Sequence, residues 1–330
     1  EEYIKFIGRD LFTKDLRKTL TEFEEADNFG SLIQPTISNV DDILATLEAK
    51  DDQLDLFLVD THKSILKILK QAKYLSPIYH AVIANPPYLG GKGMNKRMSA
   101  WLKDNYPSVK SDLFSSFVLR CSVLGTEFAN IGIMSPNVWM YISSHQKLRT
   151  FLTLNKNLTN LVELPLTGFK GATVQICAYN FINQAAKNTK GGFIRLVDFK
   201  GGDKEMALYT RNAIKDRSCD WYYESSPTDF KKIPGSPIAY WVSDKVRDIF
   251  ENSPALGEVA DARQGMATTD NNRFLRLWYE VKLKEIGFGM GNREQAQQSG
   301  LKWFPYNKGG KFRKWYGNQD FIENWENDGQ

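Results

Sequence analysis

The sequence predicts an α/β fold, in which part of a doubly wound sheet is followed by a smaller domain of mixed α/β structure. Between residues 79 and 181, short β-type runs alternate with helical stretches, which is the pattern of a doubly wound sheet. Past about residue 200, breaks rich in Gly, Pro and Asn divide the chain into short elements. We therefore expect one domain at residues 1–200 and a second at residues 201–330.

The first domain is expected to begin with helices. Residues 1–75 are rather charged, and apolar residues such as Leu16, Leu20 and Phe23 recur at spacings of three and four. This periodicity is typical of amphipathic helices that bury one face.

A β-type run at residues 79–84 follows these helices and predicts the first strand. It must end at Asn85-Pro86-Pro87-Tyr88, because two consecutive prolines cannot continue a central strand. Downstream, Ser111-Asp112 is a helix N-cap pattern, and the amphipathic stripe at residues 113–124 predicts the helix that it caps.

The remaining strands of the first domain come next. Residues 131–135 predict a strand that Pro136 ends, and a helical stretch follows to about Asn155. Residues 161–164 and 174–181 predict two further strands with a loop between them.

Composition excludes several classes of protein. Hydrophobic residues make up 42% of the chain and charged residues 25%, so it can bury a core. Its three cysteines form no CxxC pair and its three histidines no metal-ligand spacing, so we expect no metal, no disulfide scaffold and a reducing cytoplasm. No apolar run approaches the length of a membrane span, so no membrane partner is expected. A formal charge of +4 argues weakly for nucleic acid, so that argument rests on local clusters.

The sharpest candidate site is Asn85-Pro86-Pro87-Tyr88, at the carboxyl end of a predicted strand and before a glycine-rich loop. Open α/β sheets bind their ligands at that end of the strands. The spacing alone leaves open that these four residues are an ordinary strand-ending turn.

This arrangement resembles the methyltransferases that modify adenine N6 in DNA, whose Rossmann-like sheet carries such a tetrapeptide. The resemblance implies that Asn85 and Pro86 accept hydrogen bonds from the adenine amine, with Pro87 holding the backbone rigid. It also implies that Tyr88 and Phe169 stack on a base that has left the duplex. Phe169 as a plain core residue remains an alternative.

The C-terminal third narrows the resemblance. Residues 263–275, 303–310 and 311–317 are similar to target-recognition segments of the adenine methyltransferases of BREX phage defence (the PglX type) and of fused restriction–modification enzymes. Residues 301–319 hold five Lys or Arg, six aromatics and no acid, which suits phosphate contact and base stacking. An aromatic core with solvated lysines is the alternative. The expected DNA-contacting residues are Arg273, Lys302, Asn307, Lys308, Lys311, Arg313 and Lys314.

The resemblance implies S-adenosylmethionine as methyl donor and double-stranded DNA as substrate, with other phage-defence proteins as further partners. Such a cofactor site needs a glycine-rich turn after a first strand, and no such unit precedes Asn85. We therefore expect this chain to be a fragment without the cofactor half and to be inactive or weakly active alone. Asn85 is the expected contact to the cofactor; Asp27 and Asp112 are weaker candidates, with a solvated loop residue and a helix cap as their respective alternatives.

Two other functions stay open from the sequence. One is a DNA-binding specificity module of a defence complex without catalysis of its own. The other is methylation of glutamine or RNA, because the same tetrapeptide accepts other planar amino groups. No nuclease motif supports DNA cleavage by this chain.

Overall fold

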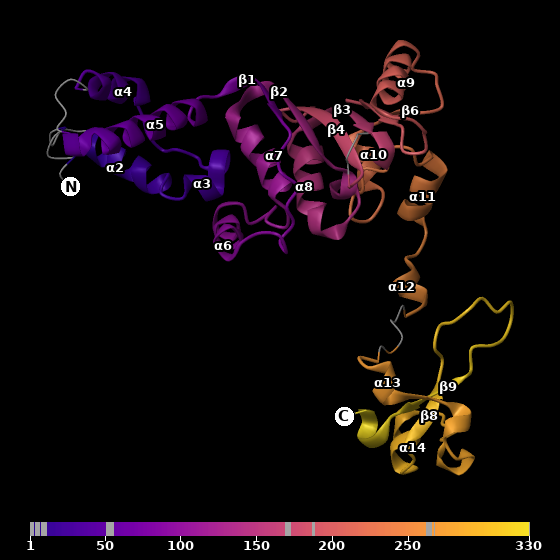
Figure 1. Cartoon of the computed structure of the whole chain (residues 1–330). Coiled ribbons are helices and arrows are strands. Elements are labelled where there is room, and N and C mark those ends of the chain that lie inside the picture. Colours follow the sequence, from indigo (N-terminus) through magenta and orange to yellow (C-terminus); the bar gives the residue numbers. More distant parts are fainter. Residues whose placement is uncertain are drawn as a thin grey trace. The chain divides into compact units, whose positions relative to one another are not determined.

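The computed structural model describes residues 3, 7, 12–50, 56–168, 173–186, 189–261, 266 and 268–329. The chain forms two compact units, Glu1–Ala255 and Leu256–Gln330, which we call the first and second units (Figure 1).

The first unit opens with the predicted helices, α2 (Phe12–Glu22), α3 (Ala26–Phe29), α4 (Val40–Glu48) and α5 (Val59–Leu75). Their apolar stripes form the core of this part, where Leu16, Phe23 and Leu69 are buried. The helical periodicity of the sequence therefore predicted these elements correctly.

A six-stranded mixed sheet follows, in the order β1-β2-β4-β3-β5-β6. Its strands are β1 (Tyr79–Ala84), β2 (Gly125–Pro136), β3 (Asn157–Glu163), β4 (Ile176–Ile182), β5 (Gly191–Arg195) and β6 (Tyr222–Ser225). β1 pairs with β2, and β3 with β5, in parallel, whereas β4 runs antiparallel between β2 and β3. The α/β class is confirmed, and two antiparallel strands, β4 and β6, make the sheet mixed.

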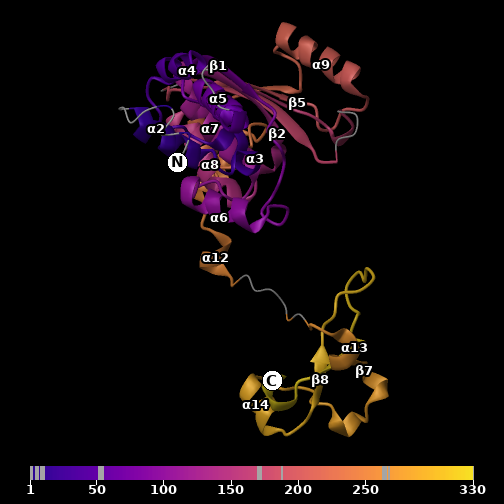
Figure 2. The same cartoon turned by 60° about the vertical axis from the view of Figure 1, so that its left-hand side comes forward.

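Helices cover the two faces of the sheet unequally. The crossover from β1 to β2 runs through α6 (Lys96–Asn105) and α7 (Leu113–Leu124), and α7 packs on β1 and β2. At the other end of the sheet, α9 (Asp203–Lys215) covers the opposite face. Successive residues of a strand point to opposite faces: on β5, Phe193 belongs to the main core, whereas Ile194 packs in a second core with Met206 and Ala213 of α9. Figure 2 shows α9 far from α2–α5 along the sheet.

Beside β1, the face away from α7 is open to solvent. The strand pairs only with β2 within the described ranges, so it forms one edge of the sheet. Val82 and Ala84 pack against the core on one side, while Ile83 on the other side is 87% exposed. An exposed edge strand with an apolar face is unusual for a natural sheet and marks a surface that can pair with another segment.

Residues 201–255 still belong to the first unit. Its last helices are α8 (Gln146–Thr150), which η6 (Phe151–Asn155) extends, then α10 (Pro227–Lys231) and α11 (Asp244–Asn252). The Arg149 guanidinium on α8 donates to the Gly235 carbonyl, and the Tyr240 hydroxyl donates to Glu163 at the end of β3. The structural division therefore falls after Ala255, later than the boundary predicted near residue 200, because these buried bonds hold the intervening segment in place.

The second unit is small and mixed, with α12 (Leu256–Val259), α13 (Asn271–Phe274) and α14 (Arg293–Gln298). Its antiparallel sheet has the order β7-β9-β8, from β7 (Leu275–Leu277), β9 (Phe321–Asn324) and β8 (Trp303–Tyr306). β9 is thus the central strand, with neighbours on both sides.

Within the described ranges, no helix is both long and apolar enough to cross a membrane. The cysteines are free thiols, and burial raises the pKa of Cys121 to about 11 and that of Cys177 to about 12.

Replacing Arg149 with Met should destabilise the first unit by about 3 kcal/mol or more. The guanidinium is 1% exposed and donates to the carbonyls of Gly235, Trp139 and Ile142, and a thioether has no hydrogen to donate to any of them. Chemical denaturation measures the change, with Arg211→Met on exposed α9 as the matched control. Equal stability of the two variants would contradict this role.

His145 should make the fold sensitive to acid. Burial, with a smaller contribution from Arg149, lowers the histidine pKa to about 4 from its ordinary 6.5. The unfolded state then binds a proton between these pH values and the folded state does not, so stability falls as pH drops from about 6.5 to 4, by about 3 kcal/mol. Unfolding curves at pH 7 and pH 5 measure this loss of stability. It should be smaller in His145→Gln than in the parent or in the control variant His80→Gln.

Candidate active site

The tetrapeptide Asn85–Tyr88 follows β1 directly, as its sequence predicted. Because β1 and β2 are parallel, the carboxyl ends of both strands meet at one edge, with Ala84 beside Ile133 and Pro136 at the end of β2. Pro86 is buried, while Asn85 is exposed to solvent. Buried Pro86 therefore anchors the backbone of the motif, while the side chain of Asn85 remains accessible to a ligand.

Tyr88 and Asn85 contact each other. The Tyr88 hydroxyl donates to the Asn85 Oδ1 at 2.9 Å, and the Tyr88 side chain is 37% exposed. Burial raises the pKa of Tyr88, with a smaller contribution from Cys177, so the phenol stays a donor. A carboxamide oxygen has two lone pairs, so Asn85 keeps one site for a second donor, and tyrosine fixes the orientation of the amide.

A second hydrogen-bond acceptor lies next to it. The carbonyl oxygen of Pro86 receives no hydrogen bond from any residue that the structure describes. The ring of Pro86 also fixes its own backbone φ angle. Asn85 and Pro86 thus offer a side-chain and a backbone acceptor at adjacent positions.

Asp112 ties this loop to the helix beneath it. Its Oδ1 accepts from the Phe114 amide at the start of α7 and from the Leu89 amide just after the motif. The Leu113 amide returns a bond to the Leu89 carbonyl. Burial raises the Asp112 pKa, although these backbone bonds oppose it. The predicted helix cap is confirmed, and the cap also anchors the motif loop.

A buried polar cluster around Glu163 occupies the same edge of the sheet, and no sequence pattern indicated it. Glu163, 3% exposed at the end of β3, accepts from the Asn137 amide at 2.8 Å, the Tyr141 hydroxyl at 2.7 Å and the Tyr240 hydroxyl at 2.8 Å. Burial and the neighbouring carboxylate raise the pKa of both tyrosines, so both remain donors.

The other predicted residues of the first unit lie elsewhere. Asp27 is exposed on α3 and lines a cavity with Gly30, Lys67 and Tyr74, to which no residue of the tetrapeptide contributes. Phe169 lies outside the described residues. No cluster of three or more possible metal ligands occurs among the residues that were placed.

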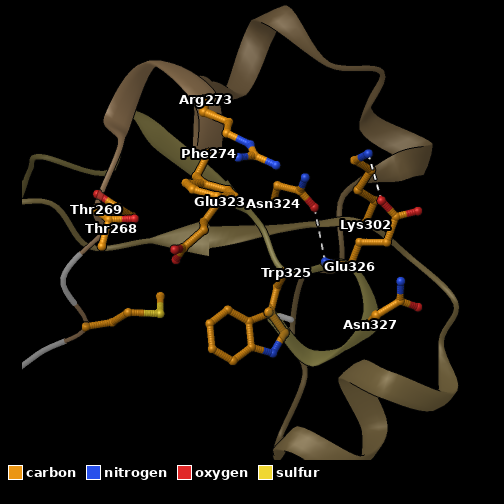
Figure 3. A pocket seen from close by; sticks show the side chains of 12 residues that line it. Thr268, Thr269, Arg273, Phe274, Lys302, Glu323, Asn324, Trp325, Glu326 and Asn327 are labelled. Atoms are coloured by element: carbon orange, nitrogen blue, oxygen red, sulfur yellow. Dashed lines mark hydrogen bonds and ion pairs between the residues drawn. The ribbon is translucent and has the colours of Figure 1, made fainter.

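In the second unit, Arg273 and Lys302 come together although they are far apart in the sequence. Both line a cavity of about 630 Å³, together with Glu323 and Trp325, which the sequence analysis did not select (Figure 3). Lys302 pairs with Glu326 at 2.8 Å.

The other predicted DNA-contacting residues lie in the loop 307–320 between β8 and β9 and do not line this cavity. They are Asn307, Lys308, Lys311, Arg313 and Lys314. The same loop exposes three aromatic rings, Phe312, Trp315 and Tyr316. The basic-aromatic stretch at residues 301–319 therefore has two parts. Trp303, Phe304 and Tyr306 are half-buried in β8, whereas the other three rings are exposed in the loop.

Comparison with known proteins finds similar methyltransferases. Residues 10–169 match the family model of the Eco57I restriction-modification methylase. The chain is 34% identical to the adenine-specific methyltransferase PglX of Lacticaseibacillus casei (strain Zhang), over 98% of this chain and 27% of that protein. It is 35% identical to the adenine-specific methyltransferase BrxX of Escherichia coli O9:H4 (strain HS), over 96% of this chain and 26% of that protein. The chain thus spans about a quarter of the length of these relatives.

A solved structure also matches part of the fold. It is the methyltransferase subunit of a type I restriction-modification system from Streptococcus thermophilus, at 13% identity and a TM-score of 0.40, over 71% of this chain and 58% of that one.

Asp112→Ala should cost about 1 kcal/mol of stability, because α7 loses its N-cap, and should also release the Leu89 amide. Asp112→Asn keeps the acceptor oxygen and should retain most of the stability. Denaturation of both variants measures the first effect, and amide hydrogen exchange at Leu89 measures the second. Unchanged exchange at Leu89 in Asp112→Ala would mean that the loop is held by other contacts.

Proposed function

Because residues 10–169 match the family model of the Eco57I restriction-modification methylase, we propose that this protein methylates N6 of adenine in DNA. The observation that carries the proposal is the paired acceptors at Asn85 and Pro86, at the carboxyl edge of two parallel strands. We place the reaction in phage defence or restriction–modification, the setting of the similar proteins.

The chemistry requires an oriented amine. The exocyclic nitrogen of adenine is a poor nucleophile, because its lone pair is delocalised into the ring. We infer that Asn85 Oδ1 and the Pro86 carbonyl each accept one of its N–H bonds, which favours a tetrahedral nitrogen and directs the lone pair outward. These acceptors act by position and not as strong bases.

Atoms and charges balance in the methyl transfer. S-adenosylmethionine would supply the methyl group as an electrophile carried on a sulfonium. The nitrogen forms one new bond to carbon and afterwards releases one proton to water. Asn85 and Pro86 hold the amine throughout, and Tyr88 holds Asn85 in the accepting orientation.

The described residues fit only the substrate side of this reaction. Those before β1 form helices, and no strand followed by a glycine-rich turn occurs among them to hold a nucleotide-like cofactor. Asn85 is the residue that we propose to face the methyl donor. We assign no cofactor role to Asp27 or to Asp112, since Asp27 lies in a separate cavity and Asp112 caps α7.

Base access completes the proposal. A base inside a duplex cannot reach Asn85, so the adenine must leave the stack before it reacts. The partly exposed ring of Tyr88 offers one face for stacking, and we propose Phe169 for the other. The second unit would hold the duplex through Arg273, Lys302 and the loop 307–320, where exposed cations and aromatic rings alternate.

Asn85→Ala in the full-length protein should abolish detectable adenine methylation, a loss of at least about 100-fold, because one of the two acceptors disappears. Transfer of labelled methyl groups to unmethylated duplex DNA measures the rate. Asn160→Ala, which changes an exposed asparagine on β3, is the matched control and should keep the parental rate.

Normal methylation by Asn85→Ala would contradict the proposal. If the parental protein binds DNA but transfers no methyl group to it, the protein is a specificity module without catalysis. Methyl transfer to protein or RNA, and none to duplex DNA, would identify a different substrate.

A further inference from the structure

The cavity of the second unit contains a carboxylate that the fold does not use. Glu323 lies on β9, the central strand, and is 6% exposed. Its cross-strand neighbours are the apolar Leu275 on β7 and Phe304 on β8. Among the residues that the structure describes, its carboxylate has no hydrogen-bond or ion-pair partner.

Such an arrangement is costly. An ionised carboxylate out of water normally needs a cation or several donors, and burial accordingly raises the pKa of Glu323. Leu or Val would suit this position on β9 better if only folding mattered. The carboxylate oxygens are not sealed in the core, because Glu323 lines the cavity of about 630 Å³. In Figure 3 the carboxylate points into the space between Thr268 and Trp325.

The walls of the cavity indicate what enters it. The Arg273 guanidinium lies 5.0 Å from the ring of Phe274 and forms no ion pair with the described residues. Lys302 is already neutralised by Glu326. Of the charged side chains that line the cavity, Glu323 and Arg273 therefore form no ion pair with the described residues, and the indole of Trp325 lies beside them (Figure 3).

A carboxylate beside a guanidinium complements the donor and acceptor groups that base edges present in the major groove. A carboxylate accepts from an exocyclic amino group, and an arginine donates to the acceptor edge of guanine. Glu323 would repel a phosphate placed next to it, so this part of the cavity suits a base edge better than the DNA backbone. A free cation is disfavoured by Arg273.

We propose that Glu323 determines sequence specificity by accepting a hydrogen bond from the exocyclic amino group of one base, cytosine N4 or adenine N6, in the recognised DNA sequence. Arg273 contacts an acceptor edge beside it. This inference rests on the proposed function only in taking duplex DNA as the ligand, and it requires no methyl transfer.

The test is selection of bound duplexes from a randomised library by the full-length protein, the parent against Glu323→Met. Methionine has a similar length but carries neither the charge nor a strong hydrogen-bond acceptor. One position of the selected sequence should lose its preference for an amino-bearing base by roughly 5- to 150-fold, and the other positions should stay the same. Glu294→Met, at an exposed acid of α14 that does not line the cavity, is the matched control and should keep the parental sequence.

Base analogues identify the source of the amino group. At the affected position, 2-pyrimidinone replaces cytosine or unsubstituted purine replaces adenine, so that only the amino group is removed. The parent should bind the analogue duplex more weakly by the same factor, and Glu323→Met should bind both duplexes equally. Only the analogue of the contacted base should have this effect.

An unchanged selected sequence in Glu323→Met, or uniform weakening at every position, would overturn the proposal. If Glu323→Met does not fold, Glu323→Asp keeps the carboxylate and must keep the same preferred base with weaker binding. The readout is binding, so a failed methylation assay leaves this test intact. Conversely, loss of the Glu323 effect leaves the Asn85 assignment untouched.

Discussion

The buried carboxylate of Glu163 joins three parts of the first unit that are distant in the chain. It ends β3 and is solvated by an amide after β2 and by two tyrosine hydroxyls, one of them on the segment after residue 200. Neutral donors can stabilise a buried charge only while all of them stay in place, because each missing bond leaves part of the charge unsolvated. The loop after β2, the end of β3 and the segment around Tyr240 must therefore fold as one piece.

That constraint matters for the site because β2 is the strand beside β1. The parallel pairing of β1 and β2 sets the height of Asn85 relative to Pro136. Asp112 fixes the other side of the motif loop, through Leu89, to the start of α7. The tetrapeptide thus lies between two rigid supports, and its own prolines limit the movement left to it. Such rigidity suits catalysis that works by position.

The elements that the sequence predicted well are those fixed by local chemistry. The strand at residues 79–84 and the cap at Asp112 come from patterns within a few residues, and both lie at their predicted places. Glu163 and Glu323 could not be predicted, because their surroundings come from segments tens of residues away. The late division at Ala255 has the same cause, since the bonds from Arg149 and Tyr240 to distant partners have no local sequence signature. The Arg273 and Lys302 cavity shows how pairing of short strands assembles a site from separated residues.

The connection between the units has an evolutionary consequence. Residues 251–261, which include α12, are all exposed, so no buried packing depends on their side chains. A genetic crossover within this stretch would leave both cores intact and exchange a whole cavity at once. New variants of the second unit could then be inherited as blocks, and substitutions at single positions such as Glu323 could diversify them further. The same exposed stretch is the natural joint at which to build chimaeras between relatives.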